Sequence, residues 1–185
     1  APPAPSQARW RWWRGPGAAV SRLTVTPMAS LREPVLAHVA LGANLGDAAR
    51  SVRDAMDALE RLPGTRGLAR SSLYRSAPVD ADGPDYVNAV VALWTALSAP
   101  ELLAQLRALE QAAGRQRPFH HAPRTLDLDL LRYGEGQIHS ATLTVPHPRM
   151  AQRAFVLRPL AEIAPRLVTA EALAAVAAQA IERLP

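Results

Sequence analysis

The sequence contains no cysteine and no lysine. Without cysteine the chain cannot form a disulfide or a thiolate metal site, which favours a reducing, cytoplasmic compartment. No apolar run approaches the roughly 18 residues that a membrane-spanning helix needs, so we expect no membrane partner. Acidic residues are also missing from one part of the chain, because none precedes Met28, whereas four arginines do.

All 21 basic residues are arginine, and they give the chain a formal net charge of +5. Because this excess lies largely before Met28, the rest of the chain is close to neutral, and we expect no nucleic-acid partner. Residues 1–34 are rich in Pro, Gly, Trp and Arg without a helical or strand period, which predicts a disordered extension. A true start at Met28 is the favoured interpretation; a functional arm and a tag remain alternatives. Residues 35–185 are expected to form one domain.

Hydrophobic periodicity predicts six elements in this domain. They are a strand at Val35–Leu41, a helix capped by Asp47 and running to Leu62, a strand at Leu68–Arg75, a strand at Tyr86–Leu97, a helix from Ala99 to Ala113, and a strand at Thr125–Tyr133. This βαββαβ order is typical of an α+β, ferredoxin-like fold, an antiparallel sheet with its helices on one face. Appended to it we expect extended chain at Ile138–Val145, a helical Met150–Ile163 and a last helix at Ala170–Arg183.

The strongest local signal is the run Pro123-Arg124-Thr125-Leu126-Asp127-Leu128-Asp129. Residues two apart in a strand point to the same face, so Asp127 and Asp129 should project together while the leucines enter the core. A pair of carboxylates suits Mg²⁺, which keeps waters and substrate phosphates among its ligands. Two solvent-facing acids on an edge strand are the alternative.

Basic residues crowd the same segment. Arg115, Arg117 and Arg124 precede the acidic strand, and guanidinium groups beside carboxylates are what a magnesium-bound polyphosphate requires. A solvated basic loop paired with the acids is the alternative. On another strand Tyr86 and Asn88 share a face, which suits a flat, hydrogen-bonding heterocycle or, equally, an ordinary core tyrosine beside a strand-end amide.

Taken together, these motifs resemble the 6-hydroxymethyl-7,8-dihydropterin pyrophosphokinase family of folate biosynthesis. The resemblance covers roughly Leu36 to Val168. Its matching blocks are His38–Asp47, Ser72–Pro78, Pro84–Ala89, Leu109–Arg115, His120–Asp129 and Val145–Met150.

The resemblance implies transfer of a diphosphate from ATP to the reduced pterin, giving AMP. It implies that Asp127 and Asp129 bind two Mg²⁺ ions and act in catalysis with Arg117 and Arg124. The implied pterin-binding residues are Gly42, Ser76, Ala77, Val79, Tyr86, Asn88 and Phe155. The implied ATP-binding residues are Glu110, Arg115, Arg117, His121, Arg124, Leu130, Thr144, His147 and Arg153. We expect a monomer.

Two other functions remain open on the sequence alone. A ferredoxin-like nucleic-acid-binding module would need exposed aromatics on a basic sheet face, which the near-neutral domain does not favour. A catalytically silent domain of the same fold would not need Asp127, Asp129, Tyr86, Asn88 and Phe155 together.

Overall fold

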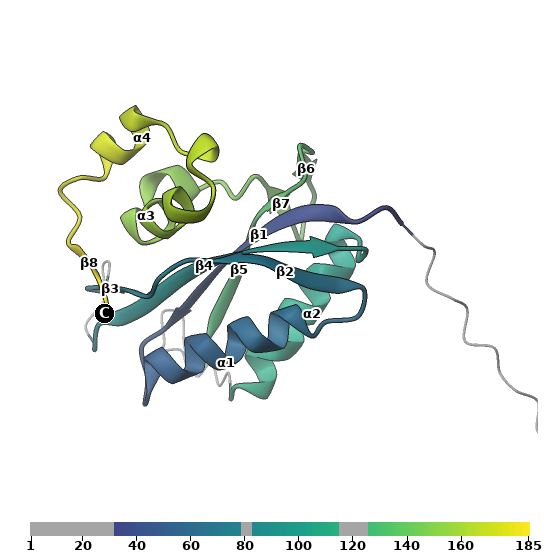
Figure 1. Ribbon diagram of the computed structural model, residues 1–185, viewed down its shortest axis with the longest axis horizontal. Coiled ribbons are helices and arrows are strands. Elements are labelled where there is room, and N and C mark those ends of the chain that lie inside the picture. Colours follow the sequence, from purple (N-terminus) through teal and green to yellow (C-terminus); the bar gives the residue numbers. More distant parts are fainter. Residues whose placement is uncertain (1–31, 79–82, 115–125) are drawn as a thin grey trace, which may run out of the picture. The chain divides into compact units, whose positions relative to one another are not determined.

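Strand β1 (Val35–Ala43) lies between two antiparallel partners, β4 (Tyr86–Thr95) on one side and β5 (Asp127–Tyr133) on the other (Figure 1). The structure is a computed structural model and describes residues 32–78, 83–114 and 126–185. The predicted disordered extension therefore lies almost entirely outside the described residues.

The sheet continues beyond β4. Strands β2 (Thr65–Arg70) and β3 (Tyr74–Ser76) both pair with β4, and β8 (Ile181–Arg183) pairs with the outer side of β3. The strand order is β5-β1-β4-β3-β8, with β2 also on β4, and every pair is antiparallel. A mixed α and β fold around an antiparallel sheet is thus confirmed.

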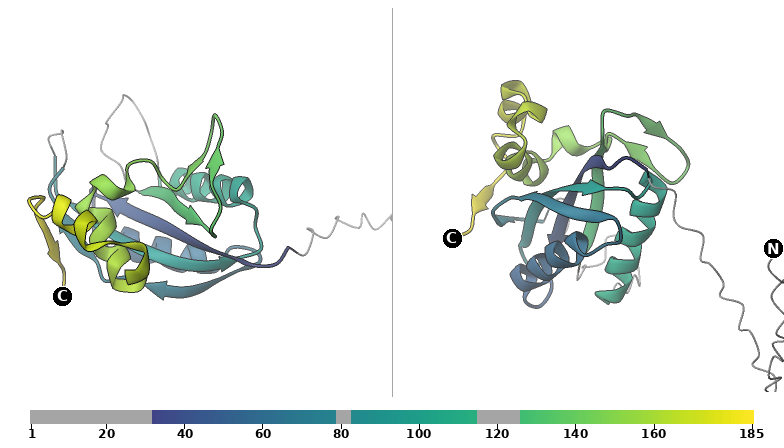
Figure 2. Two further views of the ribbon diagram at one scale, coloured as in Figure 1. Left: turned by 90° about the horizontal axis from the view of Figure 1, so that it is seen from above. Right: turned by 45° about the vertical axis from the view of Figure 1, so that its right-hand side comes forward.

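Helices lie on both faces of this sheet. The helices α1 (Ala48–Glu60) and α2 (Ala99–Ala112) share one face, whereas α3 (Ala154–Ile163) packs on the other with the short α4 (Ala170–Ala175) beside it (Figures 1 and 2). Asp47 caps α1 as predicted, because its carboxylate accepts a hydrogen bond from the Arg50 N–H at 3.0 Å.

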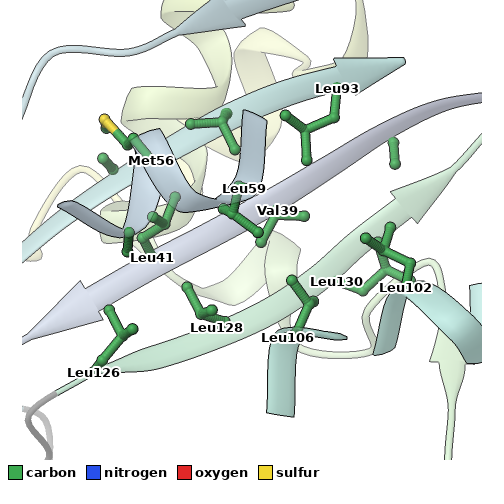
Figure 3. Close-up of a cluster of buried hydrophobic side chains, with 14 of the residues drawn as sticks. Val39, Leu41, Met56, Leu59, Leu93, Leu102, Leu106, Leu126, Leu128 and Leu130 are labelled. Carbon is green, nitrogen blue, oxygen red and sulfur yellow. The ribbon is translucent and has the colours of Figure 1, made fainter. Parts of the chain in front are cut away.

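The larger core fills the space between the sheet and the helices α1 and α2 (Figure 3). Alternate residues of each strand supply it, because successive side chains of a strand point to opposite faces. Its members include Val39, Leu41, Leu59, Leu93, Leu102, Leu106, Leu128 and Leu130, each at most 4% exposed. The opposite face carries a smaller cluster of Val90 and Leu131 with Val156 and Leu160 of α3. Polar side chains on this second face therefore lie on the side of the sheet opposite the main core.

The single strand predicted at Leu68–Arg75 is wrong, because two strands occupy this stretch. Ser71 interrupts the pairing with β4: its backbone N–H donates to the Val90 carbonyl, and its hydroxyl accepts from the Val90 N–H, both at 2.9 Å. A side chain thus takes the place of a backbone acceptor, and the ladder restarts at Tyr74 opposite Asn88.

The predicted helix at Met150–Ile163 is interrupted. A 3₁₀ turn spans Met150–Gln152, Arg153 is extended with φ −127° and ψ 111°, and α3 begins at Ala154. Gln179 fixes this break from outside, since its side chain accepts from the Ala154 N–H at 2.8 Å and donates to the Gln152 carbonyl at 2.9 Å.

The long terminal helix predicted at Ala170–Arg183 is also wrong. Helix α4 ends at Ala175, and Ile181–Arg183 form β8 along the edge of β3. The composition of this stretch favours a helix, but the backbone groups on the outer side of β3 offer hydrogen-bond partners for a strand, and pairing with them outweighs that preference. In the stretch predicted to be extended after β5, a small two-stranded sheet joins β6 (Ile138–His139) to β7 (Thr144–Val145).

A polar cluster fastens α3 to β3 and β8. Glu162 accepts hydrogen bonds from the Ser72 N–H, the Ser72 hydroxyl and the Tyr74 hydroxyl at 2.8–3.1 Å, and Arg183 lies 3.7 Å away. Burial alone would raise the pKa of Glu162, but these hydrogen bonds leave it below its usual value. None of the helices in the described ranges is long and apolar enough to cross a membrane.

His38 is a buried polar residue in β1. It is 4% exposed, and its Nδ1 has no hydrogen-bond partner among the described residues. Burial lowers the pKa of the His38 imidazole below its ordinary value, and the charge of Arg132 lowers it further. The folded protein therefore holds this ring neutral.

We expect His38 to make stability depend on pH. Because its folded pKa lies below the unfolded value of about 6.5, the unfolded state binds more protons, so stability is lost as pH falls through that value. Urea unfolding of His38→Phe should show a smaller loss of stability between about pH 7.5 and pH 5.5 than the wild type. The exposed His139→Asn is the control; an equal loss in His38→Phe and the wild type would contradict the assignment.

Candidate active site at the end of the central strand

The register of β1 brings residues of three strands to one point of the sheet. Gly42 lies opposite Asn88 of β4 and opposite Asp127 of β5, and Ala40 lies opposite Asp129. Directly opposed residues of antiparallel strands point to the same face. The two carboxylates and the amide are therefore neighbours across a glycine, on the face away from α1 and α2.

The buried leucines between and beside Asp127 and Asp129 determine which face of β5 the two carboxylates occupy. Leu126, Leu128 and Leu130 are each at most 4% exposed in the main core, so alternation turns both carboxylates to the other face. The Asp129 side chain keeps 39% exposure. The described residues contain no group of three or more potential metal-binding side chains. Two hard oxygen donors open to water fit Mg²⁺, which retains waters and phosphate ligands.

His147 approaches Asp129 from the segment after β7. Its N–H donates to the Leu131 carbonyl at 2.9 Å, which ties this segment to β5, and its Nε2 lies 4.0 Å from Asp129 Oδ2. The Arg149 N–H donates to His147 Nδ1 at 3.2 Å, so a neutral ring carries its proton on Nε2, toward the carboxylate. Burial lowers the pKa of His147 more than Asp129 raises it, which favours that neutral form.

Arg153 adds a cation to the same carboxylate. Its Nη1 lies 3.8 Å from Asp129 Oδ2, and its Cζ lies 5.4 Å from the centre of the Phe155 ring. The extended backbone at Arg153, between the 3₁₀ turn and α3, places it there. Phe155 in turn packs in the cluster that contains Ala40, the β1 residue opposite Asp129. An aromatic ring, a guanidinium and a carboxylate thus meet at this side of the site.

Glu110 contacts the acidic strand from the side of α2. Its side chain is buried, with the residue 4% exposed, and its Oε1 accepts a hydrogen bond from the Leu128 N–H at 2.9 Å. Among the described residues β5 is an edge strand, so no strand of this part of the chain pairs with the Leu128 N–H on its outer side. The peptide between the two aspartates is therefore fixed by a side chain of α2.

Toward β4, the absence of a side chain at Gly42 leaves space beside Asn88 and Tyr86, two of the predicted pterin-binding residues. A methyl group at Gly42 would lie 3.4 Å from Asn88 Oδ1 and 3.9 Å from Tyr86 Cδ1. Asn88 is buried at 4% exposure, and its amide nitrogen donates to the Ser76 hydroxyl at 2.9 Å. Ala77 follows β3 and is exposed. Gly42, Ser76, Tyr86 and Asn88 therefore form one group.

The remaining predicted residues are placed differently. The Leu130 side chain lies in the main core, on the face opposite Asp129, so only its backbone could meet ATP; Thr144 is half-buried in β7. Val79, Arg115, Arg117, His121 and Arg124 lie outside the described residues.

Asn44 lies at the end of β1 beside the candidate site, and the sequence analysis did not name it as a site residue. It follows β1, is 6% exposed, and donates to the Pro84 carbonyl at 3.3 Å, which joins the end of β1 to the start of β4. The signal was its place between two glycines, Gly42 and Gly46, directly after an apolar strand.

Comparison with known proteins identifies the family. Residues 38–165 match the profile of a family described as 7,8-dihydro-6-hydroxymethylpterin-pyrophosphokinase (HPPK). The chain belongs to the HPPK family. This range includes every site residue named above, and family membership makes the chain a pyrophosphokinase, an enzyme of folate biosynthesis.

Relatives of similar length support this assignment. A 2-amino-4-hydroxy-6-hydroxymethyldihydropteridine pyrophosphokinase of Pseudomonas aeruginosa is 48% identical over 155 residues, covering 80% of this chain and 96% of the relative. The enzyme of the same name from Methylorubrum extorquens is 42% identical over 154 residues, covering 80% and 98%.

Solved structures agree on the fold. A crystal structure described as HPPK-DHPS in complex with substrates superimposes with a TM-score of 0.58 at 12% identity, covering 71% of this chain and 40% of that one. A Plasmodium falciparum HPPK-DHPS triple mutant gives 0.55 at 13% identity, covering 71% and 38%. The chain spans less than half of these longer proteins.

Removing the Glu110 acceptor should loosen β5. We expect Glu110→Ala to lower the free energy of unfolding by about 1–3 kcal/mol, because the Leu128 N–H loses its partner. Glu110→Gln, which keeps an acceptor oxygen, should lose less, and the exposed neighbour variant Gln111→Ala should stay near the wild type. Urea unfolding measures the stabilities, and amide hydrogen exchange at Leu128 localises the effect. Unchanged exchange in Glu110→Ala would contradict the positioning role.

Proposed function

We propose that this chain transfers the terminal diphosphate of ATP to the hydroxymethyl group of 6-hydroxymethyl-7,8-dihydropterin, giving AMP and the pterin diphosphate. The observation that carries the proposal is the register at Gly42, which places Asn88 on one side and Asp127 on the other. A heterocycle bound at Asn88 would then present its substituent toward the carboxylates. The antiparallel arrangement is proposed to be the ferredoxin-like one.

Asp127 and Asp129 would hold two Mg²⁺ ions. Their partial exposure and shared face, with few other donors in the described residues, support a site whose remaining ligands are waters and phosphate oxygens. Bound there, magnesium would neutralise the triphosphate and make the pterin hydroxyl more acidic. In the transfer the hydroxymethyl oxygen forms a bond to the β-phosphorus, the bond from that phosphorus to the bridging oxygen of AMP breaks, and the hydroxyl proton is released.

His147 and Arg153 would act on the phosphate side. Arg153 is a fixed positive charge 3.8 Å from Asp129, and His147 directs an N–H toward the same carboxylate. Phosphoryl-type transfer depends on positioning the reacting groups and on stabilising the negative charge that spreads over the transferred phosphate. The Arg153 guanidinium and the His147 N–H would stabilise that charge. Arg117 and Arg124 are proposed to contribute in the same way.

Tyr86, Asn88 and Phe155 would bind the pterin. Tyr86 lies beside Gly42, and Phe155 packs with the cluster at Ala40, two residues earlier in β1. Rings at these two positions could contact a flat heterocycle from different sides, with Asn88 reading its polar edge. A nucleic-acid-binding function is not favoured by the family assignment. We also propose that the enzyme is a monomer.

Loss of either metal-binding carboxylate should abolish turnover. We expect Asp127→Asn and Asp129→Asn each to reduce the conversion of ATP to AMP, with reduced pterin as acceptor, by more than about a hundredfold. Both variants should remain folded by circular dichroism, because the side chains lie outside the core. Asp54→Asn is the control, since that carboxylate lies 70% exposed on α1 beside Arg50. An active double variant at positions 127 and 129 would overturn the metal assignment.

A methyl group at Gly42 should weaken pterin binding without unfolding the protein. It would meet Asn88 Oδ1 at 3.4 Å, an ordinary van der Waals distance, but would project into the space next to Asn88 and Tyr86. We expect Gly42→Ala to raise the KM for pterin by roughly tenfold or more while stability changes by less than about 1 kcal/mol.

The control for this variant is Gly136→Ala, whose added methyl also meets its nearest neighbour, the Tyr133 carbonyl, at 3.5 Å. It should leave the KM unchanged. A Gly42→Ala enzyme with wild-type pterin kinetics would show that the ligand does not approach β1.

A further inference from the structure

The Gln179 side chain binds the backbone on both sides of Arg153. Its Oε1 accepts a hydrogen bond from the Ala154 N–H at 2.8 Å, and its Nε2 donates to the Gln152 carbonyl at 2.9 Å. A backbone N–H can only donate and a carbonyl can only accept, so the two partners fix which way round the amide lies. Gln179 comes 25 residues after Ala154 and lies beyond residue 165, where the match to the family ends.

This pair of hydrogen bonds requires an extended residue between the two backbone groups. In extended chain the carbonyl of one residue and the N–H two residues later point to the same side, as in a parallel ladder, so one amide can bind both. In a helix the N–H groups point toward the N-terminus and the carbonyls toward the C-terminus, so one amide could not reach the same two groups. Arg153 has φ −127° and ψ 111°. The Gln179 amide therefore selects this extended conformation.

Without this contact the surrounding chain favours a helix. A 3₁₀ turn ends at Gln152 and α3 begins at Ala154, so Arg153 alone separates two helical segments. The Arg153 side chain makes no capping hydrogen bond to α3, and Gln179 binds the N–H of Ala154, a residue that is 1% exposed. If the amide were removed, a helical Arg153 would let the Met150 carbonyl accept from that N–H.

We propose that Gln179 is a positioning residue that holds the Arg153 backbone extended and so directs the guanidinium to the phosphate side of the site. The Arg153 Nη1 lies 3.8 Å from Asp129 Oδ2, and its Cζ lies 5.4 Å from the centre of the Phe155 ring. A change of Arg153 from extended to helical turns its Cα–Cβ bond to another direction and carries the guanidinium away from Asp129. This inference rests on the proposed function, in which Arg153 stabilises the triphosphate of ATP.

The backbone that carries Gln179 is itself anchored, so the amide can act as a fixed support. The Gln179 N–H donates to the Val176 carbonyl at 3.0 Å, and Val176 packs with Leu157 of α3 in a buried cluster. Two residues after Gln179, Ile181 begins β8 and pairs with β3. Contacts with α3 and with the sheet therefore hold the support that binds the backbone beside Arg153.

Thr169 offers a matched control in the same part of the chain. Its hydroxyl accepts from the Ala172 N–H at 3.1 Å and caps α4, much as Gln179 binds the first N–H of α3. Both Thr169 and Gln179 are exposed. Gln179→Met and Thr169→Val each remove the acceptor with little change in side-chain size. If Gln179 only stabilised a helix end, the two variants should behave alike, whereas we expect Thr169→Val to leave nucleotide affinity near the wild-type value.

The test is calorimetric binding of a non-hydrolysable ATP analogue, with Mg²⁺, to the full chain. Gln179→Met and Gln179→Ala should each weaken binding by about three- to tenfold, part of the effect of one charge-assisted hydrogen bond. Both should remain folded, because the side chain is exposed. In an Arg153→Ala background the further change Gln179→Met should have no effect, because the guanidinium that it positions is absent. In turnover the KM for ATP should rise by a similar factor, and the KM for pterin by less than about twofold.

The outcomes separate this inference from the proposed function. If the wild type binds no ATP analogue and forms no AMP from ATP and reduced pterin, the proposed function fails. If the wild type binds the analogue but Gln179→Met binds it equally well, or weakens binding as much in the Arg153→Ala background as alone, the positioning role of Gln179 is wrong. An equal loss in Thr169→Val, or a larger rise in the KM for pterin than in that for ATP, would also contradict it, since either would trace the effect to general packing of the C-terminal segment.

Discussion

The site depends on the pairing of β1 with two strands at once. In this register a single residue without a side chain, Gly42, lies between Asn88 and Asp127. The pairing places the polar side chains of the candidate site on the two strands that flank β1, with the Asn88 amide on β4 and the carboxylates of Asp127 and Asp129 on β5. A shift of one residue in either pairing would turn the polar side chains of that strand into the main core. The leucines of β5, each at most 4% exposed, resist that shift.

Each polar strand is also fixed by a side chain outside the pairing with β1. Glu110 of α2 accepts from the Leu128 N–H between the two aspartates, and Ser76 of β3 accepts from the Asn88 amide. Neither acceptor is more than 7% exposed. A hydrogen bond shielded from water is costly to leave unmade, so both contacts limit the positions open to the groups they hold. The Leu128 N–H and the Asn88 amide are thereby held by hydrogen bonds within the protein itself.

Local patterns predict the parts of this structure that local physics determines. The alternation from Leu126 to Leu130 is sufficient to place Asp127 and Asp129 on one face, because a strand has a period of two and one of its faces is buried. The capping of α1 by Asp47 follows from the chemistry of a helix end. The predicted strand across Ser71 and the predicted helix through Ile181 are wrong, because partners distant in sequence decide them: Val90 for the first and β3 for the second. The hydrogen bond from the Asn88 amide to the Ser76 hydroxyl likewise joins residues on different strands, and no spacing rule reveals it.

The strand β8 lies on the outer side of β3, and the Leu184 N–H extends that pairing by donating to the Leu73 carbonyl at 2.8 Å. Glu162 and Arg183 tie the same edge to α3. β3 therefore carries the Asn88 support on its inner side and would be a bare sheet edge without β8. Exposed edges recruit strands from other molecules. β8 therefore moves the exposed edge of the sheet from β3 to a strand of three residues that carries Glu182 and Arg183, and short, charged edges pair poorly with other molecules. Its loss would expose the strand that contacts Asn88.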